Sequence, residues 1–200
     1  MNKLSLALVA LSLSLASAQA APKTFKVGAG RPTMQLATVD SHTDLEAMTG
    51  RTDKVSGSLT FDPAKKSGSG RIVVDAASID TGIDLRDEHM RGKMWLDVEE
   101  HPTIEFQTTN VKWVSGDTYT VTGKFTMHGV TKTLTTKATV KYMPGSAKTK
   151  AAGFAGDVLL VKTSFSVKLS DFGITIPAAA QGKISNAVTI SVSAYGQSGA

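Results

Sequence analysis

The stretch Tyr119–Val140, YTVTGKFTMHGVTKTLTTKATV, decides the fold class of this chain. On both sides of His128-Gly129, apolar or small residues alternate with threonines and lysines at every second position. Alternation with a period of two is typical of a β-strand with one face buried and the other in water. The His128-Gly129 pair marks a tight turn. The stretch therefore predicts two antiparallel strands joined by a short turn.

The same alternation recurs along most of the chain, and turn residues separate the alternating segments. These segments are Thr24–Val27, Met34–Asp40, Ser56–Phe61, Arg71–Ser78, Thr103–Thr109, Thr163–Ser170 and Ala187–Tyr195. A lone sheet with one apolar face needs a cover, and the chain contains few residues in a helical pattern to provide one. Closing the sheet on itself supplies the cover and removes the exposed edges. We therefore predict an all-β fold, an antiparallel up-and-down β-barrel of about eight strands.

The stretch Asp75–Phe106 is the longest break in the alternation. Asp84 is placed to cap a helix at its N-terminus and Arg91 lies near the helix end, an order of charges that suits the helix dipole. Pro102 prevents the helix from continuing into the next strand. We predict one short helix between strands, from Asp84 to Trp95, packed at one end of the barrel.

The apolar positions of the strands define the predicted barrel interior. Small residues such as Gly123 and Ala138 alternate there with bulky ones and leave volume that a fully packed core would fill. An eight-stranded barrel either fills with its own side chains or holds one slim ligand, and alternation alone leaves both open. The interior positions that we assign to an apolar tunnel are Ile72, Val74, Ile104, Phe106, Val121, Gly123, Phe125, Met127, Leu134, Ala138, Val140, Phe165, Val167 and Ile190.

The interior predicts an apolar ligand because it lacks the convergent polar groups that a sugar or nucleotide requires. At roughly 0.8 kcal/mol per buried CH₂ group, a five-carbon isoprene unit gains about 3–4 kcal/mol before ordering costs. A few such units are sufficient for tight binding. We therefore expect a bound lipid chain of the isoprenoid type.

Residues 1–20 have the form of a secretory signal peptide. Lys3 is followed by the apolar run LSLALVALSLSLA and by small residues up to Ala20. We predict cleavage after Ala20, a mature domain of residues 21–200 and a periplasmic or secreted location. No segment has the roughly 20 apolar residues of a membrane helix, so we predict no stable membrane insertion. Because the chain has no cysteine, disulfides and thiol chemistry are excluded.

Composition and motifs argue against several other functions. The formal net charge is +5, but the lysines are dispersed and form no basic run, which argues against nucleic acid as a partner. The chain lacks a G-x-S-x-G elbow, an H-E-x-x-H motif and a phosphate-binding loop, so we predict no enzyme. His89 and His101 lie near several acidic residues, but their spacing matches no standard ligand pattern. We predict no metal and no other cofactor.

The helical region is predicted to form the rim of the barrel. Its polar residues would anchor the helix through charged hydrogen bonds, and its apolar residues would pack on the rim or gate an opening, since methionine tolerates varied partners. An alternative is that the Asp87 carboxyl acts as a general acid in an apolar pocket. The predicted rim residues are Arg86, Asp87, His89, Met90, Met94 and Trp95.

Four segments resemble the YceI-like family, and the resemblance covers nearly all of the mature chain. They are Val74–Val111, Tyr119–Val140, DFGI at Asp171–Ile174 and ISNAVTISV at Ile184–Val192. The resemblance implies an exported, lipocalin-like barrel that binds polyisoprenoid lipids. Members often carry two phenylalanines where Met94-Trp95-Leu96 stands, a departure that bears on contacts at the helix exit rather than on the tunnel.

These observations favour a non-catalytic binding or transport protein that carries a polyisoprenoid or a similar amphipathic lipid. Two alternatives from other classes remain open. One is an enzyme that acts on a lipid head group near Asp87 and His89, and the other is a filled barrel that serves as a stress-related interaction module. The oligomeric state, monomer or homodimer, also remains open.

Overall fold

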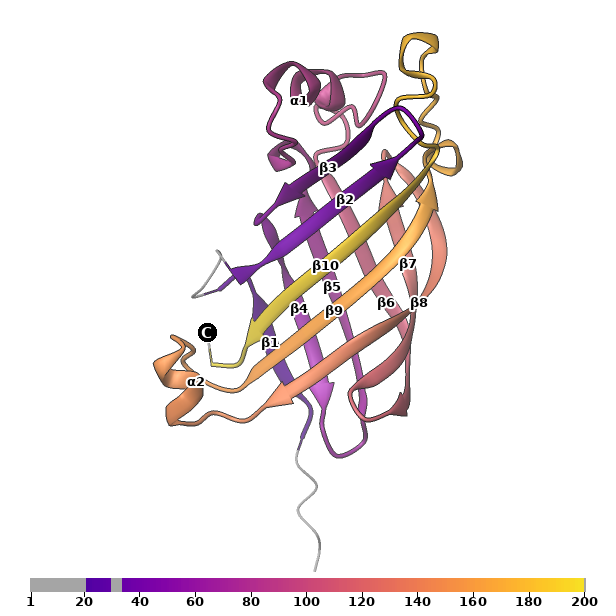
Figure 1. The fold of residues 1–200 in the computed structure, drawn as a ribbon. Coiled ribbons are helices and arrows are strands. Elements are labelled where there is room, and N and C mark those ends of the chain that lie inside the picture. The colour runs from indigo at the N-terminus through magenta and orange to yellow at the C-terminus, as the bar shows by residue number, and fades with distance from the viewer. Residues whose placement is uncertain (1–20, 30–33, 200) are drawn as a thin grey trace, which may run out of the picture.

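The computed structural model describes residues 21–29 and 34–199 of the chain (Figure 1). The predicted signal peptide, residues 1–20, lies outside the described residues, so cleavage after Ala20 stays a prediction. The strands are β1 (Lys23–Val27), β2 (Leu36–His42), β3 (Ala47–Thr52), β4 (Val55–Asp62), β5 (Ser67–Asp75), β6 (Thr103–Ser115), β7 (Thr118–Met127), β8 (Val130–Met143), β9 (Val158–Lys168) and β10 (Ala187–Gln197). The α-helices are α1 (Asp84–Arg91) and α2 (Ala147–Ala151).

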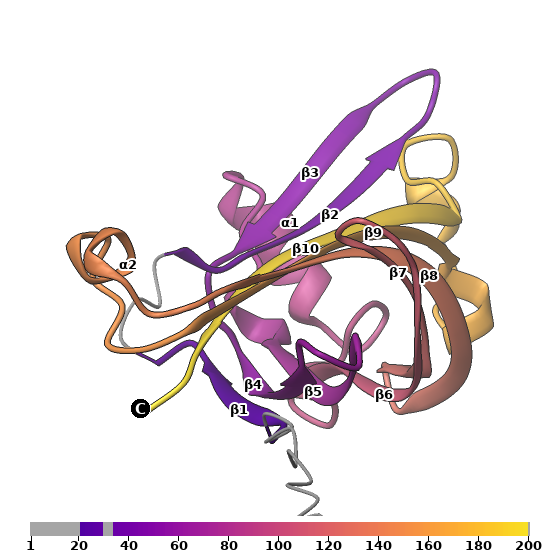
Figure 2. The same cartoon turned by 90° about the horizontal axis from the view of Figure 1, so that it is seen from below.

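Eight of these strands form a closed antiparallel barrel, as the alternation predicts. The order is β1-β4-β5-β6-β7-β8-β9-β10, and pairing of β1 with β10 closes the ring (Figure 2). The stretch Tyr119–Val140 forms the β7–β8 hairpin, with Met127 paired to Val130 across the turn. None of the helices in residues 21–29 and 34–199 is long and apolar enough to cross a membrane.

Strands β2 and β3 form a hairpin attached to the barrel rather than part of its closed ring. The closing contact between β1 and β10 is short and involves only the end of β10, Gly196 and Gln197. The earlier part of β10, Thr189–Ser193, pairs with β2 instead. Strand β3 contacts the segment after β5 through a backbone bridge between Arg51 and Asp80. The hairpin projects beyond the ring in Figure 2. It therefore closes the barrel wall at the end where β1 does not reach.

The helical region differs from the prediction in three respects. Helix α1 ends at Arg91 rather than Trp95, because the chain from Gly92 onward folds into successive turns. Ile83, not Asp84, is the N-cap residue, and it makes no side-chain capping bond. The structure has a second short helix, α2, where one helix was predicted in all, and Ser146 and Thr149 form a reciprocal capping box at its start.

The inward positions of the strands, together with the segment after β9, build two apolar clusters. One contains Phe25, Phe61 and Tyr119, and the other contains Phe125 and Phe172, whose rings meet edge to face at 5.4 Å between centroids. Edge-to-face contact is a favourable arrangement for aromatic pairs. Zero cysteines are present, so this apolar packing and the strand ladders hold the barrel together.

Candidate functional site

The barrel contains a large apolar cavity of about 620 Å³ at the end that carries α1 and the β2–β3 hairpin. Strands β5, β6, β7, β9 and β10 supply its walls, and the hairpin and α1 cover part of its opening. Its volume lies within the roughly 300–1,000 Å³ typical of small-molecule sites. The wall residues include Val39, Met48, Ile72, Val74, Ile104, Phe106, Phe125, Met127, Phe165, Leu169, Ile174, Ile184, Val188 and Ile190.

A second, smaller cavity of about 100 Å³ lies deeper in the barrel. Four side chains line both cavities and therefore form a partition between them: Ile72, Phe106, Phe165 and Val192. All four are partly buried and apolar.

Charged side chains line the large cavity together with exposed apolar residues of α1 and its flanks. The Arg86 guanidinium pairs with the Glu46 carboxylate of β3 at 2.7 Å, which ties α1 to the hairpin. Lys183, on the loop before β10, also lines the cavity and has no ion-pair partner among the described residues. Leu85 and Met94 are 61% and 70% exposed although they line the same cavity. The opening is thus amphipathic.

Glu105 lies in β6 between Ile104 and Phe106, whose side chains face the cavity, so alternation places its carboxylate on the outer side of the wall. The Arg71 guanidinium of β5 donates two hydrogen bonds to the Glu105 carboxylate. These bonds hold the pKa of Glu105 below its usual range, although burial acts in the opposite direction. The carboxylate is therefore ionised and paired at neutral pH.

Asp87 is buried, but its side chain does not line the large cavity and is held instead by neighbouring residues of the chain. Its Oδ1 atom accepts hydrogen bonds from the Thr81 backbone N–H at 2.9 Å and the Thr81 hydroxyl at 2.7 Å. Burial raises the pKa of Asp87, but these hydrogen bonds outweigh burial and leave the pKa below its usual range. Asp87 is thus an ionised anchor that fixes α1 to the preceding segment.

The structure brings together most of the sequence-predicted tunnel residues, but in two cavities rather than one. Three predicted positions line neither cavity: Gly123, Leu134 and Val167. Leu134 and Val167 pack against the cluster around Phe125. At Gly123 the expected free volume is absent, because a Cβ atom there would lie 2.4 Å from Cζ of Phe106. The Phe106 ring occupies that space.

The remaining predicted residues divide between the two cavities. Those lining the large one are Ile72, Val74, Ile104, Phe106, Phe125, Met127, Phe165 and Ile190, and five of the six rim residues, all except Asp87, line it too. Those lining the small one are Val121, Ala138 and Val140, with Ile72, Phe106 and Phe165 shared.

The sequence interpretation missed the contribution of the hairpin and of the loop before β10. Val39 alternates with Ala37 in β2, so period-two alternation contained a signal for it. Met48 in β3, and Ile174 and Ile184 in the loop, lie in segments without clear alternation. Their place on the cavity wall follows from chain topology and not from a local pattern.

Comparison with known proteins agrees with this architecture. The YceI-like domain model matches residues 23–195. A UPF0312 protein of Pseudomonas aeruginosa is 35% identical over 126 residues, which cover 62% of this chain and 62% of that protein. The match thus spans less than two thirds of the relative's length.

Two solved structures share the fold. Burkholderia cenocepacia BcnA superposes with a TM-score of 0.70 at 24% identity, over 83% of this chain and 98% of that chain. A polyisoprenoid binding domain from Saccharophagus degradans superposes with a TM-score of 0.65 at 18% identity, over 87% of this chain and 98% of that chain. From its closed barrel and the match over nearly all of its described residues, the chain belongs to the YceI-like domain family.

Proposed function

We propose that this protein is an exported, non-catalytic carrier that holds a polyisoprenoid or a similar amphipathic lipid inside the barrel. The apolar chain lies in the large cavity, and the polar head group stays at the opening beside Arg86 and Lys183. The observation that carries the proposal is an apolar cavity of about 620 Å³ with an amphipathic opening. At roughly 0.8 kcal/mol per buried CH₂ group, such a cavity stabilises a bound lipid chain by several kcal/mol.

The ligand class is supported by one structural neighbour. The Saccharophagus degradans domain is described as polyisoprenoid binding, and it shares this fold at 18% identity. Because the two proteins share a fold, we propose the same class of ligand for this chain. The lining of the cavity points the same way, because it is dominated by aliphatic and aromatic side chains.

Catalysis on a lipid head group has less support. Asp87, weighed above as a general acid, already accepts two hydrogen bonds from Thr81. It is also absent from the described residues that line the large cavity, whereas His89 is among them. A general acid must reach its substrate within hydrogen-bond distance. We therefore assign Asp87 an anchoring role.

A matched pair of variants tests the carrier function. Val74 points into the large cavity, and its neighbour Val73 lines neither cavity. We expect Val74→Phe to reduce uptake of a polyisoprenoid at least tenfold, because the ring occupies ligand volume, and Val73→Phe to leave it unchanged. Uptake is measured with purified protein and a defined polyisoprenol, after organic extraction and mass spectrometry.

Two results would contradict the carrier function. One is wild-type protein that repeatedly yields no lipid on extraction from its native host and takes up none when it is offered. The other is uptake by correctly folded Val74→Phe that equals uptake by Val73→Phe and wild type, which would show that the cavity does not hold the lipid. Export is tested separately by cell fractionation and by sequencing the mature N-terminus, which we expect at Ala21.

A further inference from the structure

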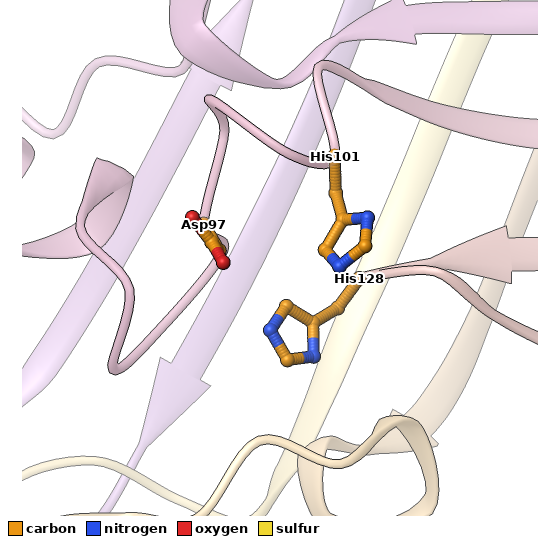
Figure 3. A group of neighbouring side chains, drawn as sticks. All are labelled: Asp97, His101 and His128. Carbon is orange, nitrogen blue, oxygen red and sulfur yellow. The ribbon is translucent and has the colours of Figure 1, made fainter.

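Asp97, His101 and His128 converge at the barrel end that carries α1 (Figure 3). One possible ligand atom from each side chain lies within 4.8 Å of the other two. Asp97 and His101 stand at the two ends of one hydrogen-bonded turn, in which the His101 N–H donates to the Asp97 carbonyl at 2.8 Å. His128 belongs to the turn between β7 and β8. The cluster thus joins two segments that are distant in sequence.

One oxygen of the half-buried Asp97 carboxylate lacks the partner that a buried oxygen requires. Its Oδ1 atom is buried and accepts no hydrogen bond from any described residue. No hydrogen bond or ion pair among the described residues joins this carboxylate to either imidazole. Buried polar atoms are nearly always satisfied, and a cation held between this oxygen and the two imidazoles would satisfy it.

His128 has the hydrogen bond that metal-binding histidines usually make on the side away from the metal. Its Nδ1 atom lies 2.9 Å from the Phe172 carbonyl oxygen. A carbonyl oxygen only accepts, so Nδ1 carries the proton and Nε2 keeps a free lone pair. This arrangement fixes the tautomer and orientation of a ligating imidazole. The donor needed for a metal bond is therefore available at Nε2.

Gly129 allows the two imidazoles to approach each other. A Cβ atom at this position would lie 2.7 Å from Cε1 of His101, so a larger residue would displace the His101 ring. With glycine there, the ring centroids of His101 and His128 are 5.0 Å apart at an interplanar angle of 79°. Gly129 is thus a positioning residue for the cluster.

We propose that Asp97, His101 and His128 bind a divalent first-row transition metal such as Zn²⁺. Two imidazole nitrogens and one carboxylate oxygen are a common donor set for zinc, and a water molecule would complete a tetrahedron. At bonds of about 2.0–2.2 Å, tetrahedral ligands lie roughly 3.3–3.6 Å apart, so small side-chain rotations close the site.

The site would brace the wall of the large cavity. Leu96 and Met127, the chain neighbours of Asp97 and His128, both line that cavity. A metal bound by the cluster would hold the turn after α1 against the β7–β8 turn. This role is independent of the lipid proposal, because metal binding can be measured on protein without lipid.

Titration of tag-free, metal-free wild-type protein with Zn²⁺ by calorimetry tests the site. We expect one Zn²⁺ per chain. Loss of a residue that only orients a metal ligand typically weakens metal binding roughly 10- to 100-fold. Asp97→Asn and His128→Gln remove ligands themselves, so each should weaken Zn²⁺ binding by more than that. His42→Gln, at an exposed histidine outside the cluster, is the matched control and should bind like wild type. Mg²⁺, which prefers all-oxygen sites, should not bind.

Two further measurements keep the test independent of folding defects. Zn²⁺ at about 100 times its dissociation constant should raise the Tm of wild type by about 5–11 °C and leave the Tm of Asp97→Asn unchanged. Co²⁺ should give the visible absorption of a tetrahedral complex in wild type and His42→Gln but not in His101→Gln. Absence of binding to wild type, or equal uptake by wild type and all cluster variants, would overturn the proposal.

Discussion

Replacement of Gly123 by alanine tests how the barrel interior is packed. Gly123 lies in β7, opposite Thr108 of β6, and the Phe106 ring covers it from the cavity side. An alanine Cβ would lie 2.4 Å from Phe106 Cζ, 2.7 Å from Phe106 Cε1 and 2.6 Å from the Gln107 carbonyl oxygen. The ring can move into the cavities that it lines, but the carbonyl belongs to the strand ladder and has little freedom. The variant is therefore overpacked.

The expected cost follows from two opposing effects. Overpacking of a well-packed interior typically costs about 1–3 kcal/mol. Replacing glycine in a strand restores about 0.5–1 kcal/mol, because the unfolded chain loses less entropy on folding. Because the Gln107 carbonyl cannot move away easily, we place the overpacking cost at about 2–3 kcal/mol, so the net destabilisation is about 1–2.5 kcal/mol. For a domain of this size it lowers the Tm by about 2–10 °C.

A double-mutant cycle with Phe106→Leu separates the ring from the backbone contact. Urea unfolding of the four proteins gives the free energy of unfolding and the coupling between the two positions. We expect Gly123→Ala to cost at least about 0.5 kcal/mol less in the Phe106→Leu background, because the shorter side chain leaves room for the new methyl group. A neutral or stabilising Gly123→Ala in the wild type, or an equal cost in both backgrounds, would refute the packing argument.

Three other predictions concern charged groups. Hydrogen bonding to Lys23 lowers the pKa of Asp157 in the folded protein, so the ionised carboxylate stabilises the fold fully at neutral pH. This contribution to the free energy of unfolding is lost as the pH falls below about 4 and through the folded-state pKa. In Asp157→Asn, the free energy of unfolding should therefore depend less steeply on pH in that range. Thr81→Val removes one hydrogen-bond donor to the Asp87 carboxylate and should lower the free energy of unfolding, measured with urea at pH 7, by about 1.5–3 kcal/mol. A decrease of less than about 0.5 kcal/mol would contradict the anchoring role. If the head group lies at the opening, Lys183→Ala should weaken binding of a polyisoprenyl phosphate more than binding of the neutral polyisoprenol, measured by fluorescence competition.

The alternation of the chain was sufficient to predict the barrel and most of its interior. Phe125 and Met127 in β7, for example, are inward and buried as period-two alternation requires. Local pattern was insufficient for β3, whose AMTGRT sequence has no apolar alternation. It forms a strand because β2 and the Asp80 bridge supply its backbone partners.

The sequence by itself determined which side of each barrel strand faces inward, because successive side chains of a strand point to opposite faces whatever the strand packs against. Only the tertiary structure decided which inward space is empty. Gly123 leaves no space because Phe106 fills it, whereas Ile72 and Val192 meet two cavities. Tertiary structure likewise brought His128 to Asp97 and His101. Cavities and side-chain clusters depend on distances between segments far apart in sequence, and no local period encodes those distances.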